Sequence, residues 1–89
     1  MDRVRIGVIG VAGMGAAHCR EAASIPEVEL KAGADVNPAN IENFKAQYGV
    51  AAYDDHRKLL EREDVDAVCI ATPHVFHRRI AEDAFAAGK

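Results

Sequence analysis

Residues 10–15, Gly-Val-Ala-Gly-Met-Gly, have the composition of a turn that can hold phosphate groups. Compared with the pattern G-x-G-x-x-G, Gly10 and Gly15 occupy the first and last positions, and Ala12 stands in the middle. The middle position lets the backbone approach a phosphate, and Gly13 beside Ala12 restores some of the freedom that the methyl group removes. A helix that starts here would point its first N–H groups at an anion. The alternative is a glycine turn needed only for close packing; we favour phosphate binding.

Asp35 stands 25 residues after Gly10, at the end of a predicted strand over 28–34. An acidic residue at this spacing accepts hydrogen bonds from the ribose hydroxyls of a bound dinucleotide. Its charge would repel a 2′-phosphate, so Asp35 favours NAD over NADP as the cofactor. The alternative is that Asp35 caps the following helix, a role for which Asn37 competes.

Two histidines lie in the segment 71–77, Ala-Thr-Pro-His-Val-Phe-His, after the last predicted strand. His74 and His77 are three residues apart on the first turn of a helix, so they point the same way. A zinc site would need a third ligand, and His18 and His56 fall on other elements, so we expect no metal. We expect His74 and His77 to face the cofactor; the alternative is that they are solvated residues at a helix start.

The elements that must position these residues alternate between strand and helix. Predicted strands cover 4–9, 28–34, 50–53 and 65–71, and predicted helices cover 16–24, 38–48, a short segment ending at Leu60, and a last segment ending before Gly88. This alternation predicts an α/β fold, a Rossmann-like doubly wound parallel sheet with strand order 3-2-1-4. The loops after Ile9 and Ala71 then flank one crevice, where such sheets bind ligands. We expect residues 1–89 to form one dinucleotide-binding domain that is incomplete.

Composition narrows the class of partner. The 89 residues are 49% apolar and 28% charged, with a formal net charge of −3 and no basic patch, so we expect neither nucleic acid nor a membrane as partner. No signal peptide or membrane span is recognisable, and the two cysteines, Cys19 and Cys69, are expected to be reduced thiols in a cytoplasmic protein. Aromatic residues expected in the core are Phe44, Tyr48, Phe76 and Phe85.

Several blocks of the chain, in this order, resemble the glucose–fructose oxidoreductase / inositol dehydrogenase (Gfo/Idh/MocA) family. They are the segments 6–18, 34–38, 48–50 with 53–55, and 65–68 running into 71–73, followed by His77. The resemblance implies an NAD(P)-binding Rossmann domain of an enzyme that oxidises or reduces sugars, cyclitols or related compounds. It also implies that the backbone of residues 12–14 holds the diphosphate and that Thr72, His74 and His77 line the nicotinamide side. The cofactor-binding residues that we expect are Gly10, Ala12, Gly13, Met14, Gly15, Asp35, Asn37, Ala71, Thr72, Pro73, His74 and His77.

Two departures from the family pattern limit what the resemblance implies. The family usually has Asn where this chain has His74. The family's Glu-Lys-Pro segment with its catalytic lysine, and its substrate-binding second domain, are not among these residues, and Lys89 does not take that role. We therefore assign no catalytic residue, expect these 89 residues to be inactive by themselves, and place a small-molecule substrate only in a longer parent protein.

Other interpretations stay open at this point. The chain could be a non-catalytic NAD-binding regulatory or partner module, or, less well supported, a Rossmann-like domain for another nucleotide, such as that of an S-adenosylmethionine methyltransferase. We also expect a homo-oligomer, with the apolar strand 65–71 at the interface.

Overall fold

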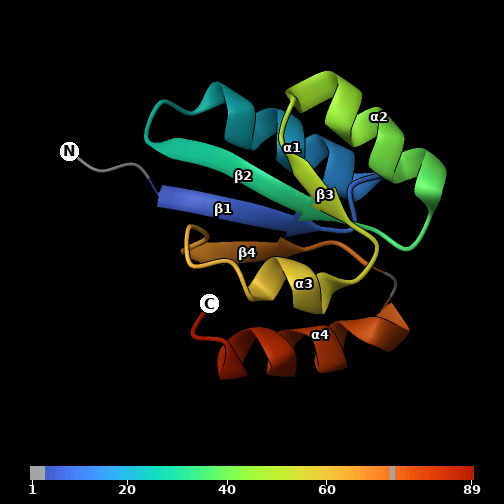
Figure 1. Ribbon diagram of the computed structural model, residues 1–89, viewed down its shortest axis with the longest axis vertical. Coiled ribbons are helices and arrows are strands. Elements are labelled where there is room, and N and C mark those ends of the chain that lie inside the picture. The colour runs from blue at the N-terminus through green and yellow to red at the C-terminus, as the bar shows by residue number, and fades with distance from the viewer. Residues whose placement is uncertain (1–3, 73) are drawn as a thin grey trace.

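The computed structural model describes residues 4–72 and 74–89, in which the four predicted strands form one parallel sheet (Figure 1). The strands are β1 (Val4–Ile9), β2 (Val28–Ala34), β3 (Ala51–Tyr53) and β4 (Ala67–Ile70). Their order is β3-β2-β1-β4, and each neighbouring pair is parallel. The predicted fold class and strand order are confirmed.

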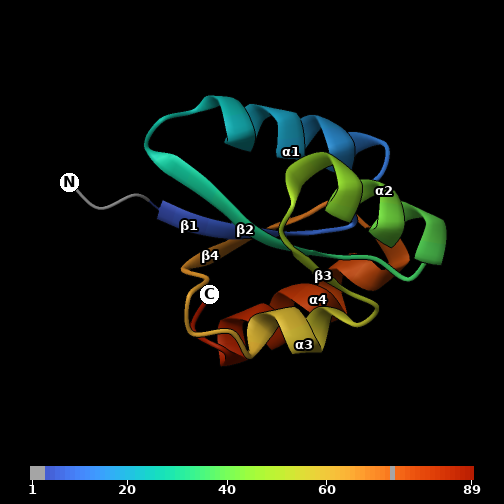
Figure 2. The ribbon, with the colours of Figure 1, turned by 45° about the horizontal axis from the view of Figure 1, so that its top comes forward.

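Helices cover both faces of this sheet. They are α1 (Met14–Ser24), α2 (Pro38–Tyr48), α3 (His56–Leu60) and α4 (His74–Ala86). Figure 2 shows α1 and α2 on one face and α3 and α4 on the other. Within the described part of the chain, no helix is long and apolar enough to cross a membrane.

Each face of the sheet has its own apolar core, because successive strand side chains point to opposite faces. Val8 packs with Cys19 and Phe44 of α1 and α2, whereas Ile9 packs with Leu59 and Ile80 of α3 and α4. The core on the first face also contains Val11 and Leu30. The two helix layers are thus fixed to the sheet by alternate residues of the same central strand.

Two of the expected core residues are confirmed and one is wrong. Phe44 is buried, and Tyr48 is partly buried beside it, with 5.2 Å between the ring centroids. Phe85 is 87% exposed, because α4 turns Ile80 and Ala84 toward the sheet and the next residue lies about 100° further round the helix. The side chain of Phe76 lies outside the described residues.

The last predicted strand is shorter than expected. β4 covers Ala67–Ile70, whereas Val65, predicted inside the strand, is a core residue that precedes it and is 1% exposed. Lys89 is held near the start of β4, because its ammonium group donates to the carbonyl oxygens of Arg62 and Val65. It therefore lies away from the carboxyl ends of the strands.

Both cysteines are free thiols. Burial of Cys19 in the core between α1 and the sheet raises the pKa of its thiol to about 11, so this group stays protonated at neutral pH. Cys69 is partly buried on β4.

The first turn of α1 lies directly against the end of β1. A Cβ atom added to Gly15 would lie 1.5 Å from the carbonyl oxygen of Gly10, and one added to Gly10 would lie 2.9 Å from the backbone of Ala71. Gly10 also has a φ of +88°, which side chains rarely allow. These two glycines therefore set the position of the helix start relative to β1 and β4.

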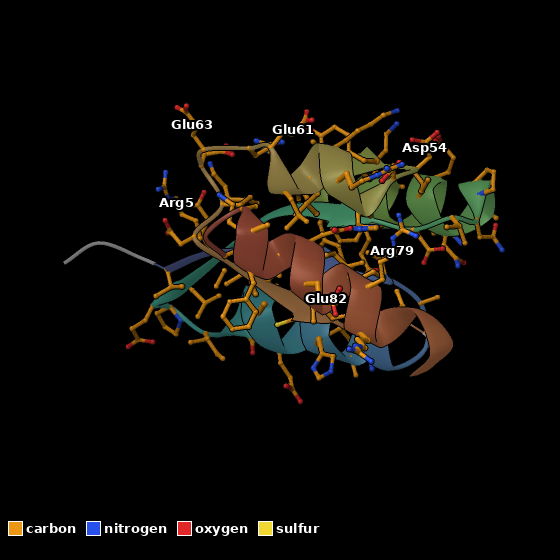
Figure 3. The ribbon with its side chains drawn as sticks, turned by 90° about the horizontal axis from the view of Figure 1, so that it is seen from below. Arg5, Asp54, Glu61, Glu63, Arg79 and Glu82 are labelled. Atoms are coloured by element: carbon orange, nitrogen blue, oxygen red, sulfur yellow. The ribbon has the colours of Figure 1, made fainter. Side chains whose placement is uncertain are left out.

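An ion pair of Arg5, which Figure 3 labels, stabilises the opposite, amino end of the sheet. The guanidinium of Arg5 on β1 donates to both carboxylate oxygens of Asp66, at 2.9 and 3.1 Å, and the backbone N–H of Arg5 donates to the same side chain at 2.9 Å. These bonds lower the pKa of Asp66 to about 2.

We predict that Asp66→Asn lowers stability only where Asp66 is ionised. Because the pKa of Asp66 is lowered in the folded state, the unfolded chain takes up the proton first as the pH falls. The stabilisation is fully present above pH ~4 and is lost toward pH ~2. Urea titrations of wild type and variant should therefore differ in free energy of unfolding at pH 7 and converge near pH 2.

The control variant is Glu63→Gln, which removes an exposed carboxylate with no ion pair among the described residues. It should change the free energy of unfolding little. A difference that is constant with pH would contradict the role of Asp66.

We further predict that Gly15→Ala is strongly destabilising. Its methyl group would overlap the carbonyl oxygen of Gly10, which cannot move without displacing β1. We expect a loss of about 3 kcal/mol or more in the free energy of unfolding. The matched control is Gly49→Ala, where a Cβ meets nothing within 4 Å and only the φ of +66° is unfavourable, a cost of about 1–2 kcal/mol. Equal losses in urea titrations of the two variants would show that the close approach at Gly15 is unimportant.

Candidate cofactor site

A cavity of about 770 Å³ opens at the carboxyl edge of the sheet. Its lining comes from the carboxyl ends of the four strands, from α3 and α4, and from Asn40 of α2, as expected for the crevice of a doubly wound fold. Six of the predicted site residues line it: Gly10, Ala12, Asp35, Asn37, Ala71 and Thr72. The structure therefore brings together residues that are up to 62 positions apart in the sequence.

The remaining predicted residues have different surroundings. Gly13 lines a smaller adjoining cavity of about 230 Å³, which Ala12 also lines. Gly15 lines neither cavity and has the packing role described above. Pro73 lies outside the described residues, and so do the side chains of Met14, His74 and His77.

The turn after β1 offers backbone N–H groups to an anion. Ala12 and Gly13 are exposed, and their N–H groups have no hydrogen-bond acceptor among the described residues. Gly13 is the N-cap of α1 and has no side chain that could accept a hydrogen bond from the first turn. The N–H groups at the positive end of the helix dipole therefore receive no side-chain cap. α1 begins at Met14, two residues earlier than predicted, because Gly13 already completes the turn with a φ of +58°. Diphosphate oxygens match this arrangement.

The carboxylate of Asp35 joins the glycine turn to the start of α2. One oxygen accepts the N–H of Val11 at 3.1 Å, and the other accepts the N–H of Asn37 at 2.9 Å. Asn37 itself caps α2, since its side chain accepts the N–H of Ala39 at 2.9 Å. Capping of α2 is therefore the role of Asn37, and Asp35 is held beside the glycine turn. Each of its oxygens keeps a lone pair for an outside donor.

Thr72 supplies an independent indication that a polar group belongs here. Its hydroxyl oxygen is buried and has no hydrogen-bond partner among the described residues. Thr72 lines the cavity, and its methyl carbon would lie 3.2 Å from a Cβ added to Gly10. A buried hydroxyl without a partner is costly, and a ligand atom in the cavity would supply one.

Residues of α3 and α4 that the sequence analysis did not assign also line the cavity. They are Asp55, His56 and Arg57 at the start of α3, and Arg79, Ile80 and Asp83 on α4. His56, which the sequence analysis placed on a different element from His74 and His77, is 2.8 Å from the carboxylate of Asp83. The spacing of residues 79, 80 and 83 could have indicated that they share one face of a helix. The sequence does not show that this face meets the crevice, because the packing of α3 beside α4 decides it. Among the described residues, no group of three or more His, Cys, Asp or Glu side chains could hold a metal ion.

Comparison with known proteins shows which family and which proteins this chain is similar to. The family profile described as the oxidoreductase family with an NAD-binding Rossmann fold (GFO_IDH_MocA) matches residues 4–89. A glycosyl hydrolase family 109 protein of Shewanella sp. (strain W3-18-1) is 37% identical over the whole chain, which covers 22% of that protein. A 1-carboxy-3-chloro-3,4-dihydroxycyclohexa-1,5-diene dehydrogenase of Comamonas testosteroni is 39% identical over 91% of the chain and 21% of its own length.

Two solved structures of similar fold contain a nicotinamide dinucleotide. The scyllo-inositol dehydrogenase of Lactobacillus casei, with bound NAD(H) and scyllo-inositol, matches 99% of this chain with a TM-score of 0.92 and 32% identity. A 3-ketoreductase of Actinomadura kijaniata, in complex with TDP-benzene and NADP, matches 99% with a TM-score of 0.90 and 31% identity. The chain covers 26% and 28% of these two proteins. Because the family profile matches nearly every residue and the sheet has the expected strand order, the chain belongs to the Gfo/Idh/MocA family of oxidoreductases and has its NAD(P)-binding Rossmann fold.

Proposed function

We propose that this chain binds NAD as the cofactor-binding part of an oxidoreductase that transfers a hydride between nicotinamide and a sugar, cyclitol or related hydroxy compound. The observation that carries the proposal is the carboxylate of Asp35, which accepts the N–H of Val11 and is thereby held beside the glycine turn. Diphosphate at the turn and ribose at Asp35 are then adjacent, as they are in the dinucleotide.

The residues have separate tasks in this proposal. The N–H groups of Ala12 and Gly13 bind the diphosphate, and Asp35 accepts the hydroxyl hydrogens of the adenosine ribose. Thr72, with His74 and His77 after it, contacts the nicotinamide side. When bound, the nicotinamide ring supplies the hydride chemistry. The substrate site and the general acid–base group belong to a longer parent protein, because the family's catalytic lysine is not among these residues.

The charge of the cavity favours NAD over NADP. Four aspartates line it, against two arginines: Asp35, Asp54, Asp55 and Asp83, with Arg57 and Arg79. A 2′-phosphate would add about two negative charges at the ribose, where Asp35 already lies. NAD carries no phosphate at this position and avoids the repulsion.

A second candidate for the parent protein is glycoside hydrolysis, since a relative that is 37% identical is named as a glycosyl hydrolase family 109 protein. A non-catalytic NAD-binding module is a third. All three use the same cofactor site in this chain, so they differ only in chemistry outside it.

The proposal extends to location and assembly. A cytoplasmic protein with no nucleic-acid or membrane partner is supported by the two free cysteines and the net charge of −3. A homo-oligomer is supported by β4, which pairs only with β1 among the described residues, and by the exposed ring of Phe85 on α4.

We predict that Asp35→Ser changes the cofactor preference. Loss of the carboxylate removes charge-assisted bonds to the ribose, so NAD affinity should fall by roughly tenfold to a hundredfold, and NADP affinity should rise as the repulsion is removed. Calorimetric titration of both proteins with both cofactors measures this. The matched control is Asp54→Ser, which removes a carboxylate from the same cavity. It should leave NAD affinity within about twofold of wild type, since Asp54 makes no bond to the ribose in the proposed complex. NADP affinity that is the same before and after Asp35→Ser would contradict the ribose role.

A further inference from the structure

Most charged side chains around the cavity already have a partner. The pairs are Asp55 with Arg57 (2.8 Å), His56 with Asp83 (2.8 Å) and Asp54 with Lys58 (3.0 Å). Asp35 accepts the two backbone N–H groups described above. Arg79 is the exception, because it lines the cavity and forms no hydrogen bond or ion pair with the described residues.

Arg79 also has a place suited to a ligand. It lies on α4 one residue before Ile80, whose side chain is buried in the core beneath the cavity. Figure 3 shows Arg79 on the side of α4 that is turned toward α3. Its neighbour Arg78 does not line the cavity and is paired with Glu82 at 3.1 Å. The two adjacent arginines therefore have different surroundings.

An uncovered apolar side chain lines the same cavity from another element. Val36 follows Asp35 at the end of β2 and is 90% exposed. The same cavity has an apolar floor, since Ile9, Ala34 and Ile80 line it and are at most 6% exposed. An exposed apolar side chain, an apolar floor and a planar cation without a partner fit a flat aromatic ring.

The dinucleotide has such a ring at the right place. If Asp35 binds the adenosine ribose, the adenine that is bonded to the same ribose must lie within a few ångströms of it, next to Val36. We propose that the guanidinium of Arg79 stacks on this adenine, and that Val36 covers the ring where it meets the ribose. This inference depends on the proposed function and deepens it, because it makes Arg79 a specificity residue for the base.

The competing role for Arg79 is an ion pair with a 2′-phosphate. Three aspartates of the cavity are paired with basic side chains, but Asp35 accepts backbone N–H groups and its charge opposes a further anion at the ribose. Stacking on a neutral ring is not opposed by this charge. The two roles predict different ligands and different NMR shifts, so one experiment separates them.

The experiment uses the 89-residue chain, with ADP-ribose and NADP as ligands. Arg79→Met retains the length of the side chain without the guanidinium, and Arg79→Lys retains the charge without the plane. Arg78→Met is the matched control. We expect Arg79→Met to weaken ADP-ribose binding by about tenfold, Arg79→Lys to recover less than half of that loss, and Arg78→Met to stay within twofold of wild type.

An NMR titration reports the contact itself. The side-chain Nε–H signal of Arg79, assigned by its loss in Arg79→Lys, should move upfield at saturating ADP-ribose, because it enters the shielding region of the adenine ring. No upfield shift, or equal affinities of wild type and Arg79→Met, would overturn the stacking. A larger loss of affinity for NADP than for ADP-ribose in Arg79→Met would also overturn the stacking and indicate a phosphate contact.

If no backbone signal of residues 10–15 or Asp35 shifts saturably in wild type, the proposed function itself fails, and this inference fails with it.

Discussion

The start of α1 approaches the end of β1 so closely that no side chain fits between them. A Cβ atom at Gly15 would lie 1.5 Å from the carbonyl oxygen of Gly10. This contact fixes where α1 begins, and with it the N–H groups of Ala12 and Gly13 that have no acceptor among the described residues. The diphosphate site proposed here is a consequence of that approach, because a helix displaced by one methyl group would present its N–H groups elsewhere.

The same turn is connected to the neighbouring strand through Asp35. Because β1 and β2 are parallel, both end at the carboxyl edge, and the carboxylate that follows β2 reaches the N–H of Val11. Its second oxygen accepts the N–H of Asn37, which caps α2. One carboxylate therefore coordinates a turn and the start of a helix, and it is oriented before any ligand arrives. Such preorganisation reduces the entropy that binding must overcome.

The two faces of the sheet contribute unequally to the site. α1 and α2 flank the turn that we propose for the diphosphate, whereas α3 and α4 supply a wall of paired charges around an apolar floor. The pairs of Asp55 with Arg57 and of His56 with Asp83 satisfy these groups internally. What remains for a ligand on this side is the apolar floor and the guanidinium of Arg79, which is why this half of the cavity fits a base better than a phosphate.

The order of the elements could be predicted from the sequence, and the sequence also indicated the residues that we propose for the diphosphate and the ribose. Gly10, Gly15 and Asp35 have local constraints, a tight turn and a strand end, that spacing along the chain records. The strand order followed from the alternation of strands and helices, because parallel crossovers are nearly always right-handed. The boundaries of β4 could not be predicted, because they depend on where its pairing with β1 begins and ends. The exposure of Phe85 could not be predicted either, because it depends on which face of α4 meets the sheet. The pairing of His56 with Asp83, the orphaned hydroxyl of Thr72 and the unpaired Arg79 were decided by tertiary structure alone. Each of these features depends on which side chains of different elements come close to one another. Those distances are fixed only when the helices pack on the sheet.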